Sequence, residues 1–293
     1  MTERRPGKVP PGGFPSGHAT IKNAEIAELW PGQSVPLLKA LHILTHNGGL
    51  NADSRRKLKQ VQHLAQLIKP AIDASLKEKR LDGEDGPVLA DLGAGKSYLG
   101  FVLYDLYFGP AGRGRVIAVE ARPELIKTAK KIADDSGFER MEFVSGQIAE
   151  TQVGSVDIVT ALHACDTATD EAILFALQHE ARYVALVPCC QAELARELYD
   201  AKNDLDQLWR HPHHRRELGS HITNVLRGLY LEAHGYKVRV TELTGLEHSL
   251  KNEFIFAERH QRSNPKARAE FEKLAKEIGA QPKLLSFSSR ARP

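Results

Sequence analysis

Apolar positions follow different periods in the two parts of this chain. Between about residues 24 and 79 they recur every three or four residues, which indicates helices. Four leucines between positions 37 and 44 share one helical face, and the Asn47-Gly-Gly sequence ends that segment. Asp53 is suited to cap the helix that follows. We therefore predict two helical segments ahead of any strand.

From residue 88 onward, short apolar strands alternate with helices. Strands are predicted at 88–92, 116–119, 141–144, 156–162, 183–187, 236–243 and 253–258. Helices are predicted at 102–108, 123–136 and 170–178, from 191 to about 234, and at 266–278. We expect the last two strands to form an antiparallel pair at the sheet edge. Seven strands in this order predict an α/β fold with a Rossmann-like sheet and an N-terminal helical extension.

The 293 residues divide into four predicted parts. Residues 1–20 are rich in Pro, Gly and charge and are expected to form a mobile basic tail. Residues 21–85 form a helical N-terminal lobe, and residues 86–260 carry the sheet. Residues 261–293 add a C-terminal helix and a basic tail. A hydrophobic content of 42% is enough to fill a substantial core.

The most informative motif is the turn after the first strand, Val88-Leu-Ala-Asp-Leu-Gly-Ala-Gly-Lys-Ser97. A phosphate-binding P-loop would need glycine at Ala90, and a dinucleotide fingerprint would need glycine at Tyr98. Asp91 would also repel a polyphosphate. A carboxylate here suits the cationic amino group and sulfonium of S-adenosyl-L-methionine, which we predict as the cofactor. We accordingly interpret the fold as a seven-stranded class I methyltransferase sheet.

Cofactor contacts are predicted from position in the sheet. Ligands of such a sheet lie beyond the carboxyl ends of the strands, at the switch in strand order. Glu120 ends the second strand and is expected to accept hydrogen bonds from both ribose hydroxyls. Gln147 either reads the adenine edge or is an ordinary loop residue. The predicted cofactor-binding residues are Asp91, Gly93, Gly95, Lys96, Glu120, Gln147, Ile148 and Leu162.

Composition limits the class of protein. Three cysteines, two of them adjacent, form no disulfide framework, which indicates a reducing compartment. No stretch approaches the roughly 18 apolar residues of a membrane span, and the start of the chain resembles no signal peptide. The net charge of +3 does not by itself indicate nucleic acid. We expect a globular cytoplasmic protein that does not associate with membranes, and we favour a monomer.

Segments at the ends of the fourth and fifth predicted strands resemble one branch of methyltransferases. They read Leu162-His-Ala-Cys-Asp-Thr-Ala-Thr-Asp170 and Pro188-Cys-Cys190. Two further matches are Gly245-Leu-Glu-His-Ser-Leu-Lys-Asn252 and Arg56-Lys-Leu-Lys-Gln-Val-Gln-His-Leu64. The branch contains the tRNA acceptor-stem 2′-O-ribose methyltransferases and the methyltransferase portion of the glutathione S-transferase C-terminal-domain-containing proteins. The resemblance implies an S-adenosylmethionine-dependent methyltransferase.

Two positions depart from this branch. Asp166 stands where the branch usually has glycine, and Gln191 stands where the tRNA enzymes tend to have histidine. The zinc-finger arrays and the appended transferase-like domain of some members are missing from this sequence. The tRNA position and the ribose chemistry are therefore left open.

Methyl transfer to a hydroxyl requires removal of a proton, and His163 is the candidate base because a histidine pKa lies near neutrality. Asp166 would orient His163 or carry the developing charge; alternatively, His163 caps the strand end. Cys190, with its neighbour Cys189, is either a nucleophile for carbon methylation or a small residue of the pocket floor. Adjacent cysteines form a poor tetrahedral site, so no metal is predicted. The predicted catalytic residues are His163, Asp166 and Cys190.

Basic residues indicate the acceptor. Those after Asp53 fall on one helical face and would follow a phosphate backbone, and His211–Arg216 is interpreted as a basic loop. The predicted substrate-binding residues are Arg55, Arg56, Lys59, His63, His213, Arg215 and His248. They favour RNA as the partner, although each cluster alone is also consistent with an ordinary solvated surface.

These observations support one leading hypothesis and two alternatives. The leading hypothesis is a methyltransferase that modifies tRNA or rRNA at a ribose hydroxyl or a base nitrogen. The alternatives are a methyltransferase of a small molecule or protein, and a non-catalytic module that binds S-adenosylmethionine or RNA.

Overall fold

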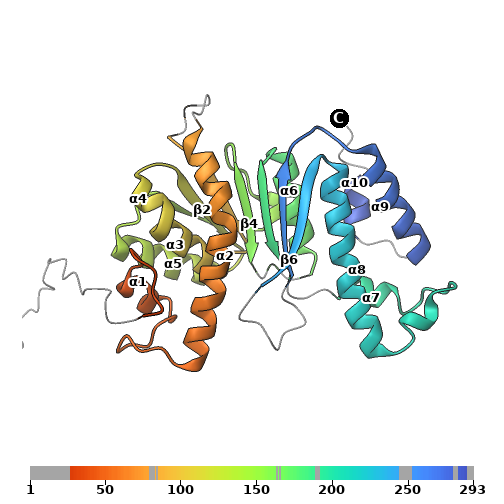
Figure 1. Ribbon diagram of the computed structural model, residues 1–293, viewed down its shortest axis with the longest axis horizontal. Coiled ribbons are helices and arrows are strands. Elements are labelled where there is room, and N and C mark those ends of the chain that lie inside the picture. The colour runs from red at the N-terminus through yellow and green to blue at the C-terminus, as the bar shows by residue number, and fades with distance from the viewer. Residues whose placement is uncertain are drawn as a thin grey trace, which may run out of the picture.

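The computed structural model describes residues 27–78, 83, 85–162, 164, 166–188, 192–243, 253–279 and 283–288. In Figure 1 a central sheet is flanked by helices. The tail predicted for residues 1–20 lies outside the described residues. So do His163, Cys165, Cys189, Cys190, Gln191 and His248.

The sheet has seven strands in the order β3-β2-β1-β4-β5-β7-β6. Their bounds are β1 Val88–Leu92, β2 Arg115–Glu120, β3 Met141–Ser145, β4 Ile158–Leu162, β5 Tyr183–Val187, β6 Tyr236–Glu242 and β7 Glu253–Arg259. The first five strands are parallel, and β7 runs antiparallel to both β5 and β6. The predicted Rossmann-like sheet and its antiparallel edge pair are confirmed. The order reverses between β1 and β4, which is where ligands of such sheets bind.

Helices connect and cover the strands. Two helices precede the first strand in the sequence: α1 Val35–Ala40 and α2 Ala52–Lys77. The helices between the strands are α3 Tyr98–Leu103, the π-helix η2 Tyr104–Phe108, α4 Gly109–Ala111, α5 Pro123–Ser136, η3 Ile148–Glu150, α6 Ala168–Gln178, α7 Glu193–Glu197, η4 Asp206–Leu208 and α8 Pro212–Ala233. After the last strand come α9 Pro265–Ile278 and α10 Lys283–Ser288. The predicted N-terminal helical extension is confirmed. Among the described helices, none combines the length and apolar character needed to cross a bilayer.

A separate hydrophobic layer covers each face of the sheet. One layer joins α2 and α3 to the sheet through residues such as Leu64, Phe101 and Leu89. The other includes Ile173 of α6 and Ala90 of β1. Successive residues of β1 therefore face opposite layers, and every residue of the strand is buried. Because α2 shares a layer with the sheet, the N-terminal extension packs directly on it.

Two helix boundaries differ from the prediction. Asp53 does not cap α2; the cap is Asn51, whose side-chain oxygen accepts a hydrogen bond from the Ser54 amide at 2.8 Å. Asp53 lies in the first turn instead, where its negative charge interacts favourably with the positive end of the helix dipole. The helix predicted to begin at residue 102 begins at Tyr98, and its second half is a π-helix.

The helix predicted from 191 to about 234 is three separate elements, α7, η4 and α8. Asn203 interrupts it, because its side chain accepts from the Leu205 amide and donates to the Ile278 carbonyl of α9. Pro212 then starts α8 at the first helical turn, where a missing N–H costs nothing. The segment His211–Arg216, expected to be a basic loop, is thus the beginning of a helix.

Two glycines provide a matched test of how closely the backbone segments approach. Gly235, between α8 and β6, and Gly137, at the end of α5, both have positive φ angles, +89° and +69°. A Cβ atom at Gly235 would overlap the Gln261 carbonyl oxygen, whereas one at Gly137 would meet open space.

We expect Gly235→Ala to lower the free energy of unfolding by about 2–4 kcal/mol, because strain and overlap add. Gly137→Ala adds strain alone and should cost about 1 kcal/mol. Urea unfolding measures both values. Equal losses for the two variants would contradict the close approach at Gly235.

Candidate active site

A glycine turn connects β1 to α3 at the carboxyl edge of the sheet. Gly93 and Gly95 have φ angles of +63° and +58°, a conformation that favours glycine. The Ala94 amide donates to the Val119 carbonyl of β2 at 2.9 Å, which fixes the turn against the neighbouring strand. The turn therefore presents backbone, without side-chain bulk, beside the end of β2.

Glu120 connects the end of β2 to this turn. Its carboxylate accepts hydrogen bonds from the Gly95 amide at 2.8 Å and from Arg122 Nε at 2.7 Å. Burial alone would raise the pKa of Glu120, but the hydrogen bonds from Arg122 and Gly95 outweigh it and lower the pKa below its usual value. The side chain is therefore ionised at neutral pH. Two carboxylate oxygens can accept about four hydrogen bonds. Three are already made, because the Arg122 amide also donates at 3.1 Å, so both ribose hydroxyls can bind only where Arg122 gives up one of its two bonds.

Asp91 lies behind the turn rather than on its open side. The residue is 1% exposed, and its Oδ1 accepts from the Thr160 hydroxyl of β4 at 2.9 Å. Burial raises the pKa of Asp91 to about 6, against the opposing hydrogen bond from Thr160. The sequence suggested that Asp91 contacts the bound cation directly. At 1% exposure its carboxylate has no open surface for such a contact. A buried carboxylate instead organises the turn and places negative charge beneath it.

The remaining predicted donor residues surround the same turn. Ile148 is buried at the start of η3, and a Cβ atom added at Gly93 would lie 3.9 Å from its Cδ1. Gln147 precedes it and is exposed, Leu162 ends β4 half-buried, and Lys96 is exposed within the turn. The structure thus brings these residues to one edge of the sheet.

This arrangement fits the nucleoside part of S-adenosylmethionine. An added Cβ atom at Gly93 would also lie 3.5 Å from Ala164 Cβ, so the absence of a side chain preserves space between the turn and the end of β4. Glu120 supplies the acceptor that ribose hydroxyls require, and Asp91 supplies the charge that a sulfonium favours. Phosphate binding is disfavoured by the same two carboxylates.

Asp166, in the loop after β4, fixes the segment that follows β5. Its carboxylate accepts from the Ala192 and Glu193 amides at 3.0 and 3.1 Å, and from Arg196 Nη2 at 3.2 Å. These are the first amides of α7, so Asp166 caps that helix from a distant part of the chain. Its own φ of +52° lies in the left-handed region, which favours glycine.

The described side-chain contacts of Asp166 are all with α7 and the residue before it. They give it a positioning role. The predicted role beside the acceptor or His163 stays a prediction, because His163 is outside the described residues. Burial would raise the pKa of Asp166, but the hydrogen bonds from the Ala192 and Glu193 amides outweigh it and lower the pKa.

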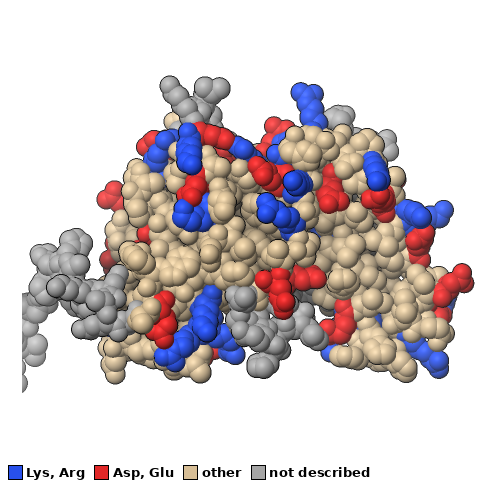
Figure 2. All heavy atoms as spheres, in the orientation of Figure 1, with Lys and Arg blue, Asp and Glu red and all other residues tan. Residues whose placement is uncertain are grey.

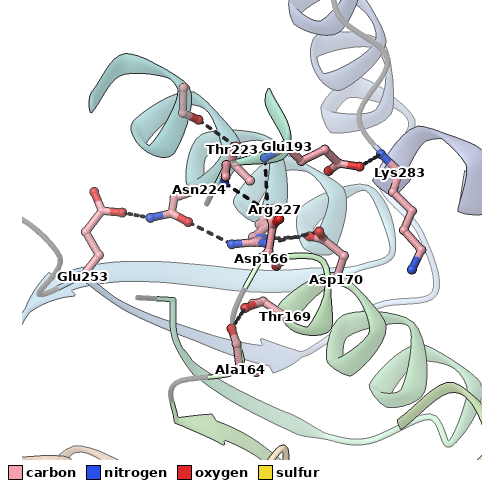
Figure 3. Close-up of polar contacts among 12 residues, drawn as sticks. Ala164, Asp166, Thr169, Asp170, Glu193, Thr223, Asn224, Arg227, Glu253 and Lys283 are labelled. Carbon is pink, nitrogen blue, oxygen red and sulfur yellow. Dashed lines mark hydrogen bonds and ion pairs between the residues drawn. The ribbon is translucent and has the colours of Figure 1, made fainter. Parts of the chain in front are cut away.

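Arg227 of α8 is hydrogen-bonded to this loop and to the first turn of α6, as Figure 3 shows. Its guanidinium is completely buried and donates to both carboxylate oxygens of Asp170, at 2.7 and 3.1 Å, and to the Asp166 carbonyl at 2.8 Å. A further bond reaches Asn224, whose amide donates to Glu253 at the start of β7. The loop after β4, α8 and β7 therefore share one polar network.

Arg227 is not among the residues that the sequence predicted for the site. One signal for it was present: Arg227 lies among Thr223, Leu226 and Tyr230 on the buried face of α8, where a lone arginine requires a partner. Asp170 was noted only as part of a motif. Among the described residues, no group of three His, Cys, Asp or Glu side chains is arranged to hold a metal ion.

Residues 56–197 match a protein family described as a methyltransferase domain. The matched residues include the glycine turn and strands β1 to β5. The match starts within α2, which agrees with the packing of α2 on the sheet. The prediction of an S-adenosylmethionine-dependent methyltransferase domain is confirmed, and with it S-adenosylmethionine as its cofactor.

A curated relative is the glutathione S-transferase C-terminal domain-containing protein of Bos taurus, 26% identical over 225 residues. The match covers 69% of this chain, which spans about a third, 33%, of the length of that relative. The predicted resemblance to this group of proteins is confirmed.

Solved structures with a similar arrangement include methyltransferases with different acceptors. A putative rRNA methylase from Clostridium thermocellum is 13% identical, with a TM-score of 0.45, over 70% of this chain and 98% of that one. Magnesium protoporphyrin IX methyltransferase from Synechocystis PCC 6803 is 12% identical, with a TM-score of 0.45, over 76% of this chain and 94% of that one.

Basic residues lie at the N-terminal end of α2. Figure 2 shows Lys and Arg side chains gathered there, at the end of the molecule where the strands β1, β2 and β4 finish (Figure 1). Arg55 pairs with Glu28 at 2.9 Å and Arg56 with Asp53 at 2.6 Å, while Lys59 is exposed and His63 is half-buried. Such exposed ion pairs contribute little to stability, so phosphates can compete for these cations.

The second predicted basic group lies at the start of α8. His213 is exposed and contacts Arg216, and the Arg215 guanidinium lies 4.9 Å from the centroid of the Tyr199 ring. In Figure 1 this end of α8 and the start of α2 lie at the same end of the molecule, on opposite sides of the sheet. The structure thus places both predicted substrate-binding groups beside the carboxyl edge.

The buried ion pair generates a stability prediction. Arg227→Met should lower the free energy of unfolding by about 3–5 kcal/mol, because it leaves Asp170 buried without its charge partner. Adding Asp170→Leu should restore much of that loss, since no unpaired charge remains. Arg216→Met, at an exposed position on the same helix, should change it by less than about 0.5 kcal/mol. Urea unfolding tests all three; a double variant less stable than Arg227→Met would contradict the pairing.

Asp91 generates a prediction about pH. Below about pH 6 the carboxyl group binds a proton and loses its attraction for a cation, so affinity for S-adenosylmethionine should rise as pH increases through about 6. Asp91→Asn should remove this component of the profile. S-adenosylhomocysteine, which lacks the sulfonium charge, should show a weaker dependence. Calorimetry between about pH 5 and 7.5 measures it, and an identical profile in Asp91→Asn would refute the assignment.

Proposed function

We propose that this protein transfers a methyl group from S-adenosylmethionine to RNA. The observation that supports RNA is the pair of basic groups, at the starts of α2 and α8, on either side of the strand edge where the donor turn lies. Phosphate contacts from lysine and arginine supply most sequence-independent affinity for nucleic acid. tRNA and rRNA remain the candidate acceptors.

The donor supplies an electrophilic methyl group on a positively charged sulfur. In this proposal Glu120 accepts hydrogen bonds from the ribose hydroxyls while it keeps its bond from Gly95. Asp91 attracts the cation from beneath the turn, and the glycines let the backbone approach it closely. Gln147 and Ile148 border the adenine, and Lys96 and Leu162 complete the predicted donor set.

His163 remains our candidate base for an acceptor hydroxyl. Its described chain neighbour Ala164 lies against the turn, since a Cβ atom added at Gly93 would be 3.5 Å from Ala164 Cβ. In the proposal Asp166 and Arg227 position that segment, and Cys190 belongs to the pocket floor. The division into parts at residues 20, 85 and 260 also stays a proposal.

The proposal is tested by incubating the protein with total RNA and methyl-labelled S-adenosylmethionine, followed by mass spectrometry of the nucleosides. We expect the label in RNA, on one type of nucleoside. Label in protein or in small molecules instead would refute the RNA acceptor. Donor binding without any transfer would favour a non-catalytic module.

The α2 group has a matched control on α9. Arg55→Ala, Arg56→Ala and Lys59→Ala together should raise the KM for RNA at least about tenfold. They should also reduce the slope of log K against log salt by about two, because each of three lost phosphate contacts contributes about 0.7. Lys266→Ala with Lys273→Ala removes exposed lysines that also pair with glutamates, and should change neither quantity. An equal effect of both sets would show that only net charge matters.

A further inference from the structure

Residues from the end of α7 to the first turn of α8 line a partly open pocket of about 460 Å³, which none of the donor contacts uses. Its volume falls within the range of small-molecule sites, roughly 300–1,000 Å³. The pocket is formed by residues 198–215, a segment that starts directly after the helix capped by Asp166. It is therefore connected to the loop at the end of β4.

This segment is firmly attached to the rest of the fold. Leu194, Leu198, Trp209 and Ile278 form a hydrophobic cluster of their own beneath it. α7 and α8 pack so closely that a Cβ atom added at Gly219 would lie 3.0 Å from the Ala195 amide nitrogen. Two lining residues, Leu198 and Trp209, are therefore fixed by this cluster.

An aromatic ring and a cation form one wall. Tyr199 is 66% exposed, although a tyrosine usually buries most of its ring, and the Arg215 guanidinium lies 4.9 Å from the ring centroid. Exposed aromatic rings beside arginine are the platforms on which single-stranded nucleic acids stack their bases.

Trp209 contributes a second aromatic side chain to the lining of the pocket. The residue is 3% exposed, and its indole Nε1 has no hydrogen-bond partner among the described residues.

The charge of the lining also suits a nucleotide. Lys202, Arg210 and Arg215 contribute three cations. Asp200 and Asp206 contribute two carboxylates, one of which accepts a hydrogen bond from Gln207 at 3.0 Å. A positive excess next to an aromatic platform matches one phosphate next to one base.

We propose that this pocket binds one unstacked nucleotide of single-stranded RNA, with its base on Tyr199 and its phosphate near Lys202 and Arg210. The inference rests on the proposed function and adds a second RNA contact, separate from the acceptor position itself. In this proposal Arg215 packs on the Tyr199 ring and contributes positive charge to the pocket, so it is more than part of a basic surface.

The two tryptophans of the chain, Trp30 and Trp209, make the site observable. In a Trp30→Phe background, light of a wavelength that tyrosine does not absorb excites only Trp209. A six-nucleotide oligouridylate, added without methyl donor, should quench that emission in a saturable way. Tyr199→Ala should weaken binding about tenfold, because base stacking on an aromatic ring contributes about 1–3 kcal/mol. Tyr199→Phe should bind like the parent.

Leu208→Ala is the matched control, because Leu208 is 54% exposed in the same segment but does not line the pocket. It should bind the oligonucleotide unchanged. No quenching, or equal affinity of Tyr199→Ala and the parent, would overturn the inference. Equal binding of a six-residue glutamate peptide would also overturn it, in favour of an acidic protein partner.

The two proposals fail in distinguishable ways. RNA methylation that is insensitive to Tyr199→Ala would refute the pocket and leave the proposed function standing. Oligonucleotide binding that depends on Tyr199, without methylation of any RNA, would refute the proposed function and leave the pocket standing.

Discussion

The hydrogen bond from the Gly95 amide to the Glu120 carboxylate is the contact on which the candidate site depends. It joins the ends of β1 and β2, whose backbones are already linked by the Ala94 amide and the Val119 carbonyl. The same carboxylate is the group expected to hold the ribose. Asp91 supports the turn from beneath, where burial raises its pKa. One small turn thus combines a fixed backbone, an ionised acceptor and a buried charge, which together suit a cationic nucleoside better than a phosphate.

A second set of contacts organises the acceptor side. Arg227 ties the loop after β4 to α8, and through Asn224 to the first residue of β7, while Asp166 of that loop caps α7. A buried ion pair gives little net stability when compared with apolar residues of the same size, but it specifies which segments lie together. Here those segments are the ones that lead toward both the donor turn and the pocket beside Tyr199.

The hydrophobic pattern was sufficient to predict the sheet. Continuous apolar runs indicated strands buried on both faces, and the acid at position 120 was placed correctly at a strand end. The pattern was insufficient where a distant residue decides local structure. Asn203 breaks a helix by bonding to α9, and the Arg227 partner Asp170 is 57 positions away. The orientation of Asp91 depends on Thr160 of a strand that the sequence does not show to be adjacent. Such contacts exist only after the chain has folded.

Calorimetric titration of the protein with S-adenosylmethionine tests the central claim most directly. The account predicts saturable binding that Glu120→Gln weakens at least about tenfold, because the amide loses the charge and one acceptor oxygen. Glu124→Gln, an exposed glutamate in the first turn of α5, should bind the donor as the parent does. Absence of donor binding in the parent, or an unchanged affinity in Glu120→Gln, would contradict it.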